Sequence, residues 1–136
     1  MTLEEKAHLV IGTGMVGTSG DSTVIGTTKK LVPGAAGTTY PIPRLGIPAI
    51  VLADGPAGLR IDPIREGDSA TYYCTHFPNG TLLASTWYQG VVEEVGKSIG
   101  TEVCEYGADV LLAVALSIHR NPLCWRNFDF YFNYPL

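Results

Sequence analysis

The stretch that decides the fold is YQGVVEEVGKSIGTEVCEYGADVLLAVAL, residues 88–116, because it joins a helical pattern to an unbroken apolar run. From Tyr88 to Tyr106 apolar side chains recur every three or four residues and charged ones fall largely on the other side. This spacing predicts an amphipathic helix that ends at Gly107. The run Val110 to Leu116 is typical of a central parallel strand covered on both faces.

The chain before this stretch supplies a first strand and so completes a β-α-β unit. Prolines precede the strand, which is predicted at Ala49 to Ala53. A further short strand is predicted at Thr81 to Ala84, and Ser85 or Thr86 is expected to cap the helix. Two glycines lie inside the helix, and they predict a close approach of another backbone there: Gly96 and Gly100.

A carboxylate, Asp54, follows the first strand within IVLADGPAGLR, residues 50–60. In parallel α/β architectures the loops at the carboxyl ends of the strands bind ligands. A carboxylate exposed there by Gly55 can accept hydrogen bonds from two adjacent hydroxyls of a polyol, whereas the alternative is a simple cap or turn acid. Further donors of the same face, each also readable as a generic surface residue, are Arg60, His119, Arg120 and Arg126.

The N-terminal part predicts one short helix and a long irregular arm. Thr2-Leu3-Glu4-Glu5 has the spacing of a capping box, and the helix should stop near Gly12. Residues 12–40 are rich in Gly, Thr and Ser and have no sustained period. Within them Gly12 to Gly17 matches the dinucleotide pattern G-x-G-x-x-G, but no helix pattern follows and residues 32–42 contain no acid, which favours a flexible arm.

Composition narrows the class of partner. The chain has 136 residues, 46% of them hydrophobic, and a net charge of −4 with scattered basic residues. These values argue against nucleic acid, an anionic membrane surface or a membrane span, and they favour a small neutral ligand. The cysteines Cys74, Cys104 and Cys124 form no Cys-x-x-Cys pair, which indicates reduced thiols and a cytoplasmic location rather than a metal site with His76 or His119.

Long ordered motifs carry a family resemblance over nearly the whole chain. The stretches LVPGAAGTTYPIPRLGIPAIVLADGPAGLRI, THFPNGTLLASTW, EEVGKSIGTEVCEYGADVLLAVALSIHRNPLC and RNF resemble the N-terminal part of glycoside hydrolase family 3, bacterial β-glucosidase type. The resemblance implies a (β/α)8 barrel packed on a second α/β domain, and removal of a terminal sugar with retention of configuration. The nucleophile and the acid/base of the family belong to later segments, so no catalytic residue is expected within these residues.

By the same resemblance, three residues should belong to the substrate-binding wall. Asp54 should accept hydrogen bonds from the sugar, Arg60 should brace its loop or reach the sugar, and Arg126 should donate to a hydroxyl. The tail departs from the family pattern, because Trp125 stands where glycine is usual. A tryptophan loses access to positive φ, which predicts a disturbed presentation of Arg126.

The fold class expected is therefore α/β, a partial (β/α)8 (TIM-type) barrel. Residues 1–136 are expected to form a single incomplete domain, with a helix and Gly/Pro-rich arm over 1–48 and a β-α-β unit with an open C-terminal loop over 49–136. The expected function is that of an N-terminal segment of a β-glucosidase-like hydrolase, and the alternative is a non-catalytic sugar-binding or self-assembling module. Expected partners are a glucose-like saccharide and either a second copy or the remainder of the barrel, with no cofactor or metal.

Overall fold

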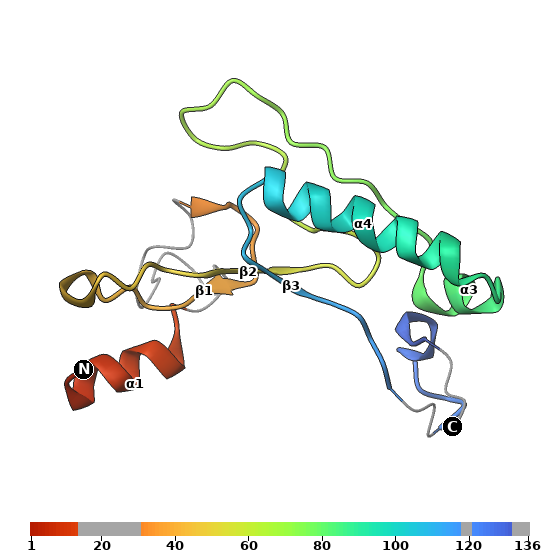
Figure 1. The fold of residues 1–136 in the computed structure, drawn as a ribbon, viewed down its shortest axis with the longest axis horizontal. Helices are drawn as coiled ribbons and strands as arrows, with labels where there is room; N and C mark the ends of the chain where they lie inside the picture. Colours follow the sequence, from red (N-terminus) through yellow and green to blue (C-terminus); the bar gives the residue numbers. More distant parts are fainter. Residues whose placement is uncertain (14–30, 118–120, 132–136) are drawn as a thin grey trace.

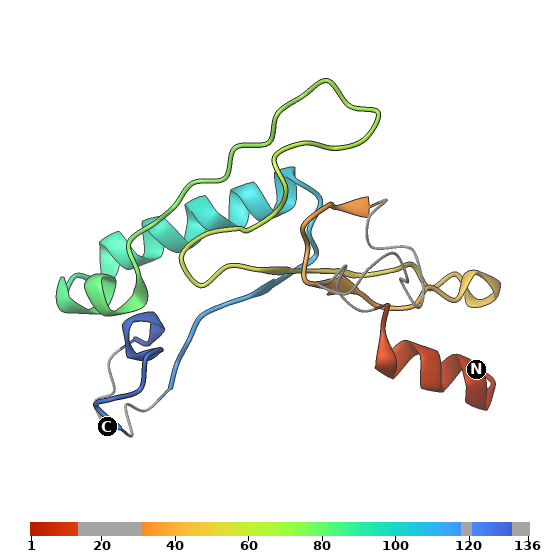
Figure 2. The same ribbon diagram turned by 180° about the vertical axis from the view of Figure 1, so that it is seen from behind.

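The computed structural model describes residues 1–13, 31–117 and 121–131. Figures 1 and 2 show helix α4 lying along one side of the strands, with α1 and the C-terminal turn η2 at opposite ends of the molecule. The described elements, in chain order, are α1 (Leu3–Ile11), β1 (Gly37–Thr38), the 3-10 turn η1 (Pro43–Leu45), β2 (Val51–Asp54), α3 (Gly80–Ser85), α4 (Gln89–Glu105), β3 (Val110–Leu112) and the 3-10 turn η2 (Asn127–Asp129).

Within the described residues the sheet has three strands in the order β1-β2-β3, and its pairing is mixed. Strand β1 runs antiparallel to β2, with Gly37 opposite Leu52. Strands β2 and β3 are parallel, with Asp54 opposite Leu112, and α3 and α4 form the connection between them. The predicted β-α-β unit is therefore confirmed, whereas β1, inside the segment interpreted as an irregular arm, was missed.

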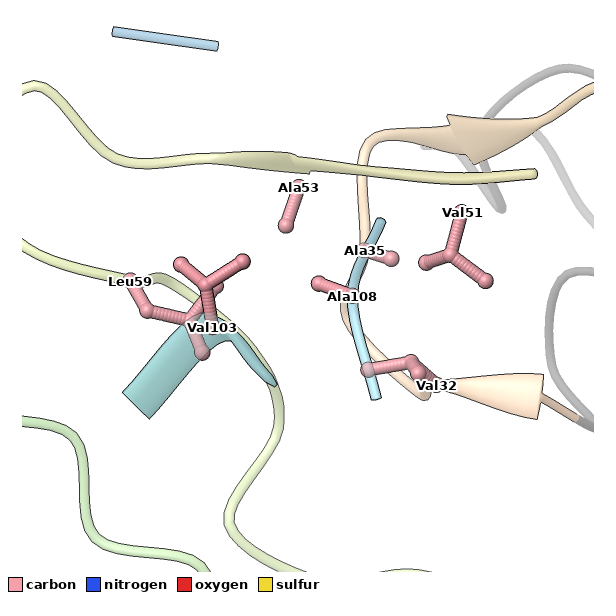
Figure 3. Close-up of a cluster of buried hydrophobic side chains, with 7 residues drawn as sticks. All are labelled: Val32, Ala35, Val51, Ala53, Leu59, Val103 and Ala108. Carbon is pink, nitrogen blue, oxygen red and sulfur yellow. The ribbon is translucent and has the colours of Figure 1, made fainter. Parts of the chain in front are cut away.

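The hydrophobic core lies where β2, the segment before β1 and the end of α4 meet (Figure 3). Ala53 at its centre is completely buried, and Val51 and Val103 are nearly so. Its members are three alanines, three valines and one leucine, and the alanines let helix and strand approach closely. The full cluster is Val32, Ala35, Val51, Ala53, Leu59, Val103 and Ala108.

After the first strand, two features predicted from the sequence differ from those in the structure. Thr81 to Ala84 form helix α3 rather than a strand, because the Asn79 side chain accepts a hydrogen bond from the Leu82 amide (3.0 Å) and so caps a helix. Helix α4 then begins at Gln89 without a side-chain cap, so the predicted caps at Ser85 or Thr86 are wrong.

The second strand is shorter and more exposed than expected. Regular pairing ends at Leu112, and among the described residues no strand pairs with the second edge of β3, so the prediction of a doubly covered strand to Leu116 is not met there. Likewise, a methyl group placed on Gly96 or Gly100 would meet nothing within 4 Å. Both glycines instead line an apolar groove of about 480 Å³ between α4 and β3, so no close backbone contact explains them here.

Helix α1 begins and ends as predicted and is held to the rest of the molecule by polar contacts. Thr2 and Glu5 form the capping box, and Gly12 ends the helix with φ of 69°. Residues 14–17 of the Gly12 to Gly17 motif lie outside the described residues. Both carboxylate oxygens of Glu5 accept hydrogen bonds from Arg44 (2.8–3.1 Å), which fixes α1 against η1.

Acid should detach α1 from η1. The hydrogen bonds from Arg44, followed by the one from the Thr2 amide, lower the pKa of Glu5 to about 2. Because this carboxyl has a depressed pKa in the folded state, its stabilisation is present above its unfolded pKa of about 4.3 and is lost as the pH falls through about 2. We expect NMR shifts of His8 and Tyr40, whose rings lie 4.8 Å apart, to change in that window.

The variant Glu5→Gln should show the detached spectrum already at neutral pH, whereas Glu4→Gln, a neighbouring acid in the same turn, should titrate like the parent. An unchanged His8 environment in Glu5→Gln would contradict this assignment of the contact.

Candidate functional site

The loop after β2 turns back on itself, and its two ends are joined by a backbone hydrogen bond and an ion pair. The Arg60 amide donates to the Asp54 carbonyl (2.9 Å), and the Arg60 guanidinium lies 3.9 Å from the Asp54 carboxylate. The two side chains are 72% and 45% exposed, so water screens this ion pair and it contributes little to stability. Both groups therefore remain able to bind a ligand.

Two glycines allow the loop to fold this tightly. A Cβ on Gly55 would lie 2.2 Å from the Gly58 carbonyl oxygen, and one on Gly58 would lie 2.2 Å from that of Thr75. Gly58 also has φ of 118°, which L side chains rarely adopt. The Phe77 amide donates to the Ala57 carbonyl (2.8 Å), so the segment around Thr75 packs directly against the loop.

That neighbouring segment is in turn fixed to helix α4. The Glu102 carboxylate accepts hydrogen bonds from the Thr75 amide (3.1 Å) and from the Thr75 hydroxyl. Next to Thr75, burial raises the pKa of the Cys74 thiol, and the negative charge of Glu102 adds to this effect. The thiol is therefore kept protonated and structural rather than nucleophilic.

A third segment, residues 125–128, approaches from the C-terminal side. The Thr81 hydroxyl of α3 lies 3.0 to 3.3 Å from the carbonyl oxygens of Asn127, Phe128 and Phe130 and can donate to any of them. Arg126 has φ of −94°, and Trp87 alone among the described non-glycine residues has a positive φ. Trp125 thus has no positive φ, so the loss of access to that conformation gives no reason for a disturbed presentation of Arg126.

These three segments enclose a cavity of about 420 Å³ at the carboxyl end of β2. It brings together the three residues selected from the sequence: Asp54, Arg60 and Arg126. His119 and Arg120, the other candidates, lie outside the described residues. The remaining lining residues are Gly55, Pro56, Ala57, Gly58, Leu59, Cys74, Thr75, His76, Trp125 and Phe128.

Residues 74–76 were not predicted to line the cavity, because they follow no period and are placed there by hydrogen bonds to distant residues, from Thr75 to Glu102 and from Phe77 to Ala57. Among the described lining residues Asp54 is the sole carboxylate, and Arg60 and Arg126 are the guanidinium groups. One acceptor of several hydrogen bonds beside two multiple donors suits a ligand with adjacent hydroxyl groups. No group of His, Cys, Asp or Glu placed to hold a metal ion occurs in the described part of the chain.

Comparison with known proteins identifies relatives of one kind. No protein-family model matches the chain. It is 42% identical over 94 residues to β-glucosidase A of Butyrivibrio fibrisolvens, which covers 69% of this chain and 11% of that protein. It is 39% identical over 104 residues to thermostable β-glucosidase B of Acetivibrio thermocellus, covering 71% and 13%.

Solved structures agree with these relatives. β-Glucosidase 3B from Thermotoga neapolitana, in complex with α-D-glucose, is 56% identical with a TM-score of 0.80, covering 96% of this chain and 18% of that one. A β-glucosidase from Paenibacillus barengoltzii is 33% identical with a TM-score of 0.70, covering 96% and 13%. The chain thus spans less than a fifth of the length of the relatives it matches.

The identities and the TM-scores place the chain among the glycoside hydrolases, the class of the matched β-glucosidases. The chain belongs to glycoside hydrolase family 3 and corresponds to an N-terminal segment of its β-glucosidases. The matched segment does not include the catalytic residues. No helix in the described part of the chain is long and apolar enough to cross a membrane.

Proposed function

We propose that this chain supplies one wall of the terminal-sugar site of a β-glucosidase-type glycoside hydrolase. The observation that carries the proposal is the convergence on one cavity of Asp54 and Arg60, from the loop after β2, and Arg126, from a segment far along the chain. In this role Asp54 accepts hydrogen bonds from two neighbouring sugar hydroxyls, and Arg126 donates to a third. Arg60 holds the loop through its contact with Asp54 and offers donors at the cavity edge.

The architecture proposed is part of a (β/α)8 barrel, with residues 1–136 as a single incomplete domain. Support comes from the parallel β2-α4-β3 unit, which is the repeat from which such barrels are built. The apolar groove between α4 and β3, lined by Val92, Ile99, Leu111 and Val114 among others, is then covered by the remainder of the barrel. The three free cysteines support a cytoplasmic location, which we also propose.

The second candidate function is a self-assembling sugar-binding module, and the open edge of β3 favours it. An unpaired strand edge beside an apolar groove can pair with a second copy of the same chain. In that case the sugar would be bound but not hydrolysed. The sugar-binding residues are the same in both candidates, so a binding experiment tests what they share.

Glucose should bind weakly to the parent chain, and Asp54→Asn should abolish that binding. The cavity is open to water, so we expect a dissociation constant no tighter than about one millimolar. The amide keeps the shape of the carboxylate but accepts through one oxygen only and carries no charge. Chemical shifts of residues 54–60 and 126, followed by NMR during titration with glucose, measure the binding.

The matched control is Glu66→Gln, which changes the net charge by the same amount at an exposed position that does not line the cavity. It should bind glucose like the parent. Shift changes that occur elsewhere, or an Asp54→Asn variant that binds as well as the parent, would show that Asp54 is a turn former and that the proposed site is wrong.

A further inference from the structure

The cavity has an aromatic flank that the polar sugar contacts leave unused. Trp125 and Phe128 both line it and are 79% and 52% exposed. Large aromatic side chains left this exposed forgo the free energy of burial, and they give the cavity an aromatic surface in addition to its polar groups.

The aromatic flank is held in position by the fold rather than by its own burial. The Thr81 hydroxyl binds the backbone of this segment, the Tyr131 amide donates to the Ala115 carbonyl (3.0 Å), and the Asn127 side chain donates to the Asn121 carbonyl (3.0 Å). These contacts come from α3, from the chain after β3 and from the turn itself. The backbone carrying the aromatic rings is therefore fixed before any ligand arrives, which lowers the entropy lost on binding.

The ring of Trp125 is also oriented by its neighbour. The Arg126 guanidinium lies 5.6 Å from the centre of the Trp125 ring, within the range of a cation–π contact. One residue that we assign to the sugar thus stands beside the indole, so a ligand held by Arg126 lies next to an aromatic surface. An aromatic group attached to the sugar would stack there.

We propose that Trp125, with Phe128 beside it, is a specificity-determining residue that selects glucosides with an aromatic aglycone. The proposal rests on the proposed function, since Asp54 and Arg126 must hold the sugar for the aglycone to reach the indole. Stacking of one aromatic pair makes an aryl glucoside bind about threefold to tenfold more tightly than an alkyl glucoside of the same sugar.

The test compares phenyl β-D-glucoside with methyl β-D-glucoside on the 136-residue chain, by NMR titration. The chain has two tryptophans, so Trp87→Phe leaves Trp125 as its only indole, and the fluorescence of that variant reports contact with the phenyl ring directly. In the parent we expect the threefold to tenfold preference for the phenyl compound. In Trp87→Phe we expect the emission of Trp125 to change with the phenyl compound alone. Trp125→Ala should bind both compounds equally, and Trp125→Phe should keep most of the preference.

The matched control is Trp87→Ala, which removes an equally exposed indole that does not line this cavity and should leave the preference unchanged. Equal binding of both compounds to the parent, or a preference that survives in Trp125→Ala, would show that Trp125 does not select the aglycone. Either result would leave the proposed sugar site unaffected. Binding of neither compound overturns both proposals. A preference lost in Trp125→Ala while methyl β-D-glucoside still binds supports both.

Discussion

Gly58→Ala should unfold the loop at residues 54–60 and abolish glucose binding, and it should destabilise the whole chain by about 3 kcal/mol. The added methyl would lie 2.2 Å from the Thr75 carbonyl oxygen, so the backbone must move. The unfavourable φ of 118° adds strain of its own. Backbone strain and overpacking each contribute about 1 to 3 kcal/mol, and here both act on one residue.

The matched control is Gly67→Ala, since Gly67 also has a positive φ (82°) but a methyl there meets nothing within 4 Å. This variant measures the cost of the positive φ alone, which we expect to lower the stability by about 1 kcal/mol. It should bind glucose like the parent. Urea unfolding followed by circular dichroism gives both differences. Equal destabilisation by the two variants would mean that the contact between Gly58 and Thr75 does not form in solution.

The 136-residue chain alone should hydrolyse no aryl β-glucoside above the rate in buffer. A retaining mechanism needs two carboxyl groups about 5 to 5.5 Å apart, and Asp54 is the sole carboxylate among the described residues that line the cavity. Release of nitrophenol from a nitrophenyl β-glucoside measures this. A steady rate that survives repurification and disappears in Asp54→Asn would overturn our assignment of this chain as a binding wall.

The same residues should support catalysis when the remainder of a barrel is provided. We expect an active chimera when this chain replaces the matching segment of Thermotoga neapolitana β-glucosidase 3B, to which it is 56% identical. In that chimera Asp54→Asn should reduce kcat/KM by about a hundredfold to a thousandfold, as loss of an oriented polar contact to the reacting sugar does. A folded but inactive chimera would favour the self-assembling module.

The sequence predicted those elements whose signals are local. The capping box at Thr2 and Glu5 defined α1, and the apolar period after Tyr88 defined α4 to within a residue or two at its C-terminal end. Both depend on contacts between residues three or four apart. The position of Asp54 and Arg60 on one loop was also predictable, because glycines and charged residues follow the strand.

Elements that depend on distant partners were not predictable in the same way. The two residues of β1 carry no period and pair only because β2 lies beside them. Thr81 to Ala84, predicted as a strand, form part of a helix because the Asn79 side chain caps it. Residues 74–76 reach the cavity through a hydrogen bond to Glu102, 27 positions further along the chain from Thr75, and no pattern encodes that distance.

The parallel pairing of β2 with β3 also sets the order of folding during synthesis. The Asp109 carboxylate that accepts from the Val51 amide is 58 residues further along the chain, so β2 has no parallel neighbour until β3 has been made. Closing so long a connection costs more entropy than a hairpin, and helix α4 shortens it by ordering the intervening residues first. During synthesis we therefore expect β2 to keep one edge unpaired while α4 emerges, and an unpaired strand edge of this kind is prone to aggregation.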